Sequence, residues 1–96
     1  MPTRKELVER FRELTELLIL DEGGPQTFRV RAYENATDAI KSTRENLEDL
    51  PVSKITKIEG IGKSTGQKIR EFFDTGTSAR LEELREKYPA EFGLLA

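Results

Sequence analysis

The chain has 96 residues, 35% of them charged and 35% apolar, with a formal net charge of −2, which fits one domain with a single modest core. It contains no cysteine and no histidine, which excludes disulfides, thiolate metal sites and acid–base catalysis by histidine. No apolar run approaches the ~18 residues of a membrane span and no signal peptide is recognisable, so we expect a cytoplasmic protein without membrane contact.

The first segment has the signals of an amphipathic helix. Thr3 followed by Glu6 is a capping-box pattern, so we expect a helix to begin near Arg4. The glycines and proline of residues 23–25 should end it, because glycine releases the chain and proline cannot continue a helix. Its predicted apolar face consists of Leu7, Phe11, Leu14, Leu17 and Leu18.

A second helix is predicted from Pro25 or Gln26 to about Asn46. The β-branched residues in "TFRVRAY", residues 27–33, leave a short strand open as an alternative. No other segment is suited to pair with such a strand, so a helix is preferred. Its apolar stripe consists of Val30, Tyr33, Ala36, Thr37 and Ile40.

Shorter elements follow from residue 51 onward. Ser53 is predicted to cap a short helix whose Ile55 and Ile58 face the core. A tight turn with Gly60 and Gly62 then leads to the next helix.

Two further helices are predicted after this turn. Ser64 is the expected N-cap of a helix that runs to about Asp74 and is closed by Gly76. Ser78 should begin the last helix, which ends before Pro89.

The glycine turn is the candidate functional element. Residues 53–80 carry six basic and three acidic groups, and the other parts of the chain are net negative. We expect the main-chain N–H groups of Gly62, Lys63, Ser64 and Thr65 to point outward as unpaired donors at a helix N-terminus, which is a phosphate-binding arrangement. The alternative is a plain connector whose glycines only allow a sharp reversal.

Three segments together resemble a known family. "FRVRAYENATDAI" at 28–40, "KIEGIGKSTGQKIREFFDTG" at 57–76 and "LEELREKYP" at 81–89 are similar, in this order, to the N-terminal domain of family-X DNA polymerases, the polymerase-beta type. The middle segment resembles the helix-hairpin-helix motif, which contacts DNA backbones without sequence preference.

The resemblance implies an all-α fold of four to five short helices with one helix-hairpin-helix, at about residues 53–75. We expect residues 1–96 to form a single DNA-binding domain, with residues 90–96 as a tail or stub. The expected state is a monomer, with a polymerase or phosphoesterase domain following in the same protein as an open possibility.

The function implied is sequence-independent binding of DNA at gaps, nicks, single-stranded regions or 5′-phosphate ends, in DNA repair or replication. A protein-interaction domain of the same fold is a rival interpretation that the overall acidity favours slightly. Tyr33 matches an aromatic residue of the family's lyase pocket, although its stripe position also makes it a core residue. The expected DNA-binding residues are Gly60, Gly62, Lys63, Ser64, Thr65, Lys68, Arg29, Arg31 and Tyr33.

A second alternative is enzymatic. In polymerase-beta-type domains a lysine attacks the sugar aldehyde of an abasic or 5′-deoxyribose-phosphate end, and Lys68 stands at the corresponding position. The supporting residues differ, because lyase members carry a histidine and a lysine where this chain has Phe28 and Arg29, and further lysines in place of Thr56 and Ser64. We therefore expect no enzymatic activity from this chain alone, with Lys68 as a phosphate-contacting or solvated lysine.

The resemblance also implies a monovalent cation. Hairpin carbonyls, here those of Thr56, Ile58 and Ile61, can hold sodium or potassium and bridge it to a DNA phosphate. No other cofactor is expected to be required.

Overall fold

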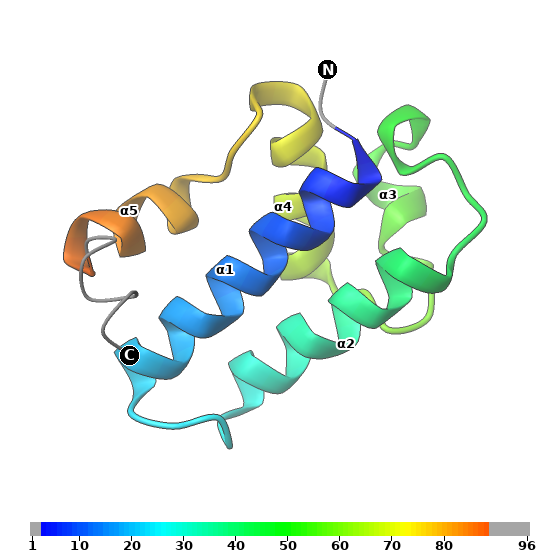
Figure 1. Ribbon diagram of the computed structural model, residues 1–96. Coiled ribbons are helices and arrows are strands. Elements are labelled where there is room, and N and C mark those ends of the chain that lie inside the picture. Colours follow the sequence, from blue (N-terminus) through cyan, green and yellow to red (C-terminus); the bar gives the residue numbers. More distant parts are fainter. Residues whose placement is uncertain (1–2, 89–96) are drawn as a thin grey trace.

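The computed structural model describes residues 3–88, and within this part of the chain every regular element is helical, which confirms the predicted all-α class (Figure 1). The five α-helices within residues 3–88 agree with the expected number. The prediction for residues 90–96 lies outside the described residues. The elements are α1 (Arg4–Glu22), α2 (Phe28–Ser42), a short 3₁₀ helix η1 (Leu47–Asp49), α3 (Val52–Ile55), α4 (Lys63–Thr75) and α5 (Ala79–Lys87).

Helix α1 has the boundaries that its sequence predicts. The Thr3 hydroxyl accepts a hydrogen bond from the N–H of Glu6 at 3.2 Å, and Gly23 ends the helix with φ of 81°. Glycine adopts this left-handed conformation at little cost in free energy, and the conformation lets the last carbonyls of a helix find hydrogen-bond partners. None of the helices within residues 3–88 is long and apolar enough to cross a membrane.

Helix α2 is confirmed as a helix, and the strand alternative is excluded. Its predicted bounds were wrong at both ends, since it begins at Phe28 and ends at Ser42. The physical reason for the late start is Thr27, whose hydroxyl accepts the N–H of Val30 at 3.3 Å and so caps the helix.

Two predicted caps near the turn are also wrong. Ser53 lies inside α3, which follows Pro51, and Ser64 lies inside α4, whose N-cap is Gly62. The start of α4 is set by Thr65, because its hydroxyl accepts the N–H of Gly62 at 2.9 Å. This bond satisfies the N–H of Gly62 and leaves the first turn of α4 without a side-chain cap.

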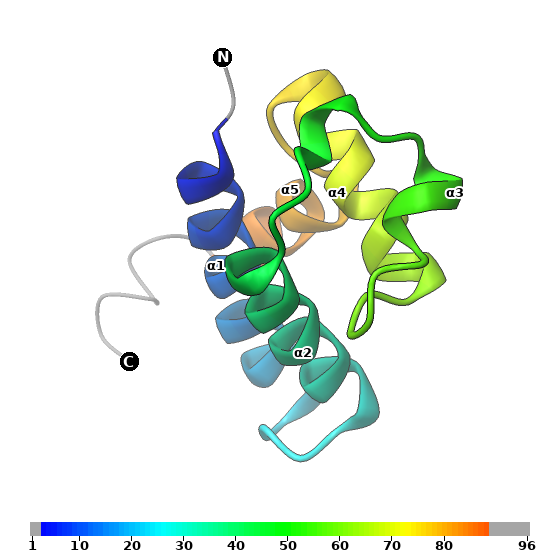
Figure 2. The same ribbon diagram turned by 90° about the vertical axis from the view of Figure 1, so that its right-hand side faces the viewer.

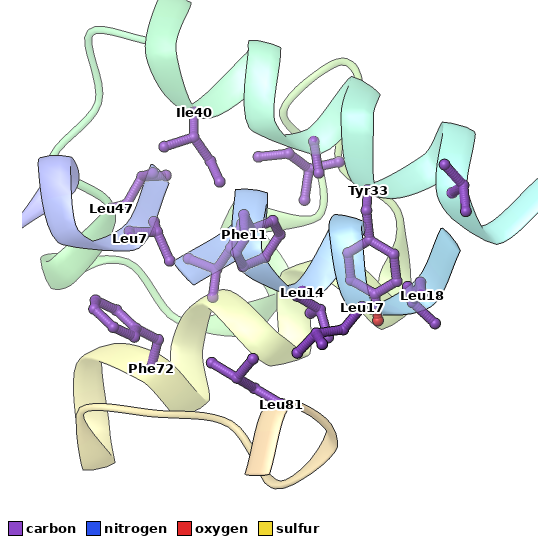
Figure 3. Close-up of a cluster of buried hydrophobic side chains, with 14 of the residues drawn as sticks. Leu7, Phe11, Leu14, Leu17, Leu18, Tyr33, Ile40, Leu47, Phe72 and Leu81 are labelled. Atoms are coloured by element: carbon purple, nitrogen blue, oxygen red, sulfur yellow. The ribbon is translucent and has the colours of Figure 1, made fainter. Parts of the chain in front are cut away.

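Helices α1 and α2 run antiparallel and enclose the core together with α4 and α5 (Figure 3). The rings of Phe11 and Tyr33 meet edge to face across the α1–α2 interface, with centroids 5.8 Å apart. Full burial of a side chain such as Leu14 contributes about 2 kcal/mol. The buried set also includes Leu7, Leu18, Val30, Ala36, Ile40, Leu47, Ile55, Ile61, Ile69, Phe72, Leu81 and Leu84.

Ion pairs hold α5 against α1. The Arg85 guanidinium donates to both carboxylate oxygens of Glu13, each at 2.7 Å, and Asp21 pairs with Lys87 and, at 3.3 Å, with Arg80. Hydrogen bonding from Arg85 holds the pKa of Glu13 below its ordinary value of 4.5. Ser78 caps α5 as predicted, by accepting the N–H of Leu81 at 3.1 Å.

Two glycines allow close contacts of the α3–turn–α4 hairpin, Gly66 within the hairpin and Gly60 between the hairpin and α2 (Figure 2). A Cβ atom on Gly66 would lie 2.6 Å from a methyl of Thr56, so α3 and α4 approach too closely for any side chain there. Gly60 has φ of 94°, and a Cβ atom there would lie 3.1 Å from the Cβ of Ala39. The turn is therefore pressed against α2, which fixes the orientation of α4.

Candidate functional site

The N-terminus of α4 presents unpaired main-chain donors. Among residues 3–88, no group accepts a hydrogen bond from the N–H of Lys63, Ser64 or Thr65. We call these three groups the open amides. The first pairing within α4 is the N–H of Gly66 with the carbonyl of Gly62 at 2.8 Å. The open amides carry the positive end of the helix dipole, since the first turn of α4 contains no acidic residue.

One of the two turn glycines differs from its prediction. The N–H of Gly62 was expected to face a ligand, which is wrong because it donates to the Thr65 hydroxyl. Gly60 is required by its positive φ and by its contact with α2, and its role in binding DNA stays a prediction. Gly62 has extended backbone angles, and a Cβ atom there would come no closer than 3.9 Å to Thr65. The fold therefore tolerates a side chain at position 62, and glycine leaves the approach to the open amides clear.

A groove runs along the seam between α2 and α4, and we call it the α2–α4 groove. It consists of two adjoining hollows of about 450 and 470 Å³. The first contains Gly60, Gly62 and Lys63, and the second contains Arg29, Tyr33 and Lys68, together with Leu18 and Arg80. The residues that both hollows share are Phe28, Ala32, Ser64 and Thr65.

Two lysines of the groove carry positive charges that no ion pair neutralises within residues 3–88. Within the described residues, neither Lys63 nor Lys68 has a carboxylate within ion-pair distance. The Lys68 amine donates to the Ser64 hydroxyl at 3.2 Å and lies 5.7 Å from the centroid of the Tyr33 ring. Tyr33 itself is buried, so it is both a core residue and part of the groove wall.

The two predicted arginines differ in position. Arg29 lines the groove and is 69% exposed, with Glu22 at 3.8 Å as a loose partner. Arg31 is exposed but lines neither hollow. The structure thus brings Arg29 together with Lys63, Lys68 and the open amides, and leaves Arg31 outside the groove.

Phe28 is a groove residue that the sequence analysis did not select as a binding residue. It is the first residue of α2, it lines both hollows, and 86% of it is exposed. The available signal was its register, since Phe28 lies off the apolar stripe of its own helix. An exposed aromatic ring beside the open amides is a surface on which a flat ligand can stack.

The three turn carbonyls are only partly available to a cation. The carbonyl of Ile58 accepts the N–H of Ile61 at 3.0 Å. Among residues 3–88, no N–H donates to the carbonyls of Thr56 or Ile61. The donor set consists of neutral oxygens, which suits sodium or potassium better than a transition metal.

Comparisons with known proteins agree with this geometry. Residues 2–78 match the family model described as "Helix-hairpin-helix domain". Over 66 residues the chain is 32% identical to the DNA polymerase/3′-5′ exonuclease PolX of Bacillus subtilis (strain 168). The aligned part is 69% of this chain and 11% of that protein, so the chain spans a small part of the relative's length. No solved structure matches the chain.

Proposed function

The chain belongs to the helix-hairpin-helix domain family, and on that premise we propose that it binds DNA through the phosphate backbone without sequence preference. The similarity to part of a family-X polymerase supports the same role. A polymerase or phosphoesterase domain in the same protein is part of this proposal.

The observation that carries the proposal is the set of open amides beside two unpaired lysines. Phosphate oxygens accept hydrogen bonds from main-chain N–H groups at helix N-termini, where the helix dipole also favours a negative charge. Lys63 and Lys68 add full charges along the same groove. Main-chain donors and lysines contact phosphates rather than base edges, so binding of this kind does not depend on sequence.

Phe28 favours DNA with unpaired bases over intact duplex. A base that is not paired can stack on the exposed ring, and such stacking contributes about 1–3 kcal/mol per base. A base within intact duplex is not free to do so. Gaps and frayed 5′-phosphate ends present both an unpaired base and an accessible phosphate, and a nick presents an accessible phosphate beside bases that can fray, so these are the proposed targets.

The test is a titration of a labelled gapped duplex at increasing salt, measured by fluorescence anisotropy. Contact with about three phosphates predicts a slope of about −2.7 in a plot of log K against log salt. Lys63→Glu should abolish most of the binding, whereas Lys5→Glu should not, since Lys5 is exposed on α1 away from the groove. Absence of binding at low salt, or equal affinities of the two variants, would reject the proposal.

A second candidate is the lyase reaction at Lys68. The amine lies at the wall of a hollow of about 470 Å³, beside Tyr33 and Ser64. In this reaction the lysine nitrogen adds to the C1′ aldehyde of the sugar, and the resulting carbinolamine loses water to form an imine. Loss of the C2′ proton then breaks the C3′–O3′ bond and the 3′ phosphate leaves, after which hydrolysis of the imine frees the lysine.

Borohydride reduction traps such an imine as a covalent adduct with abasic DNA. If the candidate is correct, the adduct forms with the wild-type protein and with Lys63→Ala but not with Lys68→Ala. No adduct with the wild-type protein excludes the reaction and leaves Lys68 as a phosphate contact.

We also propose that a sodium or potassium ion assists phosphate binding. The carbonyls of Thr56 and Ile61 would hold it, and the ion would supply positive charge next to the open amides. Replacing both ions by tetramethylammonium at constant ionic strength should weaken binding to the gapped duplex. Unchanged affinity would contradict a role for the cation.

A further inference from the structure

A third hollow, of about 460 Å³, continues the α2–α4 groove beyond the glycine turn. It shares Asn35 and Gly60 with the hollow at the open amides, so the two are adjacent along α2. Its other lining residues come from the second half of α2 and from the turn. A DNA strand that followed the seam in both directions from the open amides would enter it.

The charge of this third hollow is opposite to that of the rest of the groove. It is lined by Asp38 and Glu59, and its lining contains no lysine or arginine. Both acidic residues are exposed, and within residues 3–88 neither takes part in an ion pair. Asp38 shares a neighbouring hollow with Lys41 and Arg12, but neither of these basic residues lines the third hollow, whereas the opposite end of the groove is lined by Lys68 and Arg29.

We propose that Asp38 and Glu59 limit the DNA footprint on this domain. A strand held at the open amides is repelled from the third hollow and extends toward Lys68 and Arg29. The inference rests on the proposed DNA binding and adds to it a direction and a length. It also assigns a role to two exposed acidic residues that form no ion pair within residues 3–88.

The experiment measures affinity against strand length. Wild-type protein and the Asp38→Asn/Glu59→Gln variant are titrated with oligothymidylates of about 3 to about 12 nucleotides. Wild-type affinity should stop rising at about four nucleotides. The variant should bind the shortest strand as the wild type does and the longest about 10-fold more tightly.

Glu34 is an exposed acid of α2 that shares a hollow on the α1 side with Asp38 but does not line the third hollow. Glu34→Gln is therefore the matched control. It should leave the length profile unchanged. Equal profiles for the wild type and the double variant, or an equal gain at every length, would overturn the footprint limit while leaving DNA binding intact. Failure of the wild-type protein to bind any strand would instead reject the DNA-binding proposal and this inference with it.

Discussion

The N-termini of α4 and α5 differ in how their first main-chain N–H groups are satisfied. At α5 the Ser78 hydroxyl accepts the N–H of Leu81, and the Glu71 carboxylate accepts the N–H of Ala79 at 3.0 Å. At α4 the cap is Gly62, which has no side chain to offer.

In our proposal, the satisfied terminus of α5 serves only the fold, and the unsatisfied terminus of α4 binds phosphate. The carboxylate of Glu71 occupies at α5 the kind of place that we propose for a phosphate at α4, since both are anions facing helix N–H groups. A side-chain cap stabilises a helix by about 1 kcal/mol. The α4 terminus forgoes that stabilisation, and its donors are available to an external anion.

Adding a side-chain cap at the N-terminus of α4 should have the largest effect on DNA binding. In Gly62→Asp the new carboxylate caps α4 and faces the open amides, in the manner of α5, and the fold has room for the Cβ atom. We expect affinity for a gapped duplex to fall about 100-fold, or about 2.7 kcal/mol, while the free energy of unfolding rises. Anisotropy titration and urea unfolding measure the two effects.

The uncharged variant Gly62→Ser is the control for that experiment. It caps the helix without adding a negative charge, so its loss of affinity should be smaller. Unchanged affinity in Gly62→Asp would show that the open amides do not contact phosphate.

Removing the exposed ring should have the next largest effect. Phe28→Ala is expected to weaken binding to gapped DNA about 10-fold and to leave binding to intact duplex unchanged, because only an unpaired base can stack there. The free energy of unfolding should not fall, since 86% of the side chain is exposed. Equal losses on both DNAs would contradict the stacking role.

Removing the side-chain cap of α5 should lower stability and leave DNA binding unchanged. Ser78→Ala removes the hydroxyl that accepts the N–H of Leu81, and we expect it to lower the free energy of unfolding by about 1 kcal/mol. DNA affinity should stay at the wild-type value, as measured on folded protein. A change in affinity would indicate that the two termini are not functionally separate.

The smallest expected effect is the pH dependence of the α1–α5 contact. The pKa of Glu13 is depressed in the folded state by its bond to Arg85, so the pair contributes stability above about pH 4.5 and loses it as pH falls through the folded-state pKa. Both side chains are about one-third exposed, at 34% and 38%, which limits the contribution to less than about 1 kcal/mol.

Thermal unfolding between pH 7 and pH 3 measures this contribution. Glu13→Gln should unfold at a lower temperature than the wild type near neutral pH and at nearly the same temperature at the acidic end. A difference that grows toward low pH would have the wrong sign.

Local signals in the sequence predicted the helices well where a single cap candidate was present. Thr3 and Ser78 were identified correctly as caps. Thr27 was overlooked beside the proline at position 25, and Ser64 was preferred to Gly62. The hydroxyl of Thr65 decides the latter case by binding back to Gly62, and such a reciprocal bond depends on geometry that residue types alone do not specify.

The candidate site was predictable where it depends on neighbouring residues in the sequence. The donors of Lys63, Ser64 and Thr65 followed from the turn and the helix start, which are local in sequence. The role of Gly60 depends on contact with α2, and the exposure of Phe28 depends on how α2 faces α4. Both depend on tertiary packing.

The most direct test of the account is an amide ¹H–¹⁵N NMR titration with a short 5′-phosphorylated oligonucleotide. We predict the largest shifts at the N–H groups of Lys63, Ser64 and Thr65, and little change at Ala79 and Leu81, whose donors are already bonded. Shifts confined to other surfaces, or none at the start of α4, would contradict the claim that its open amides bind phosphate.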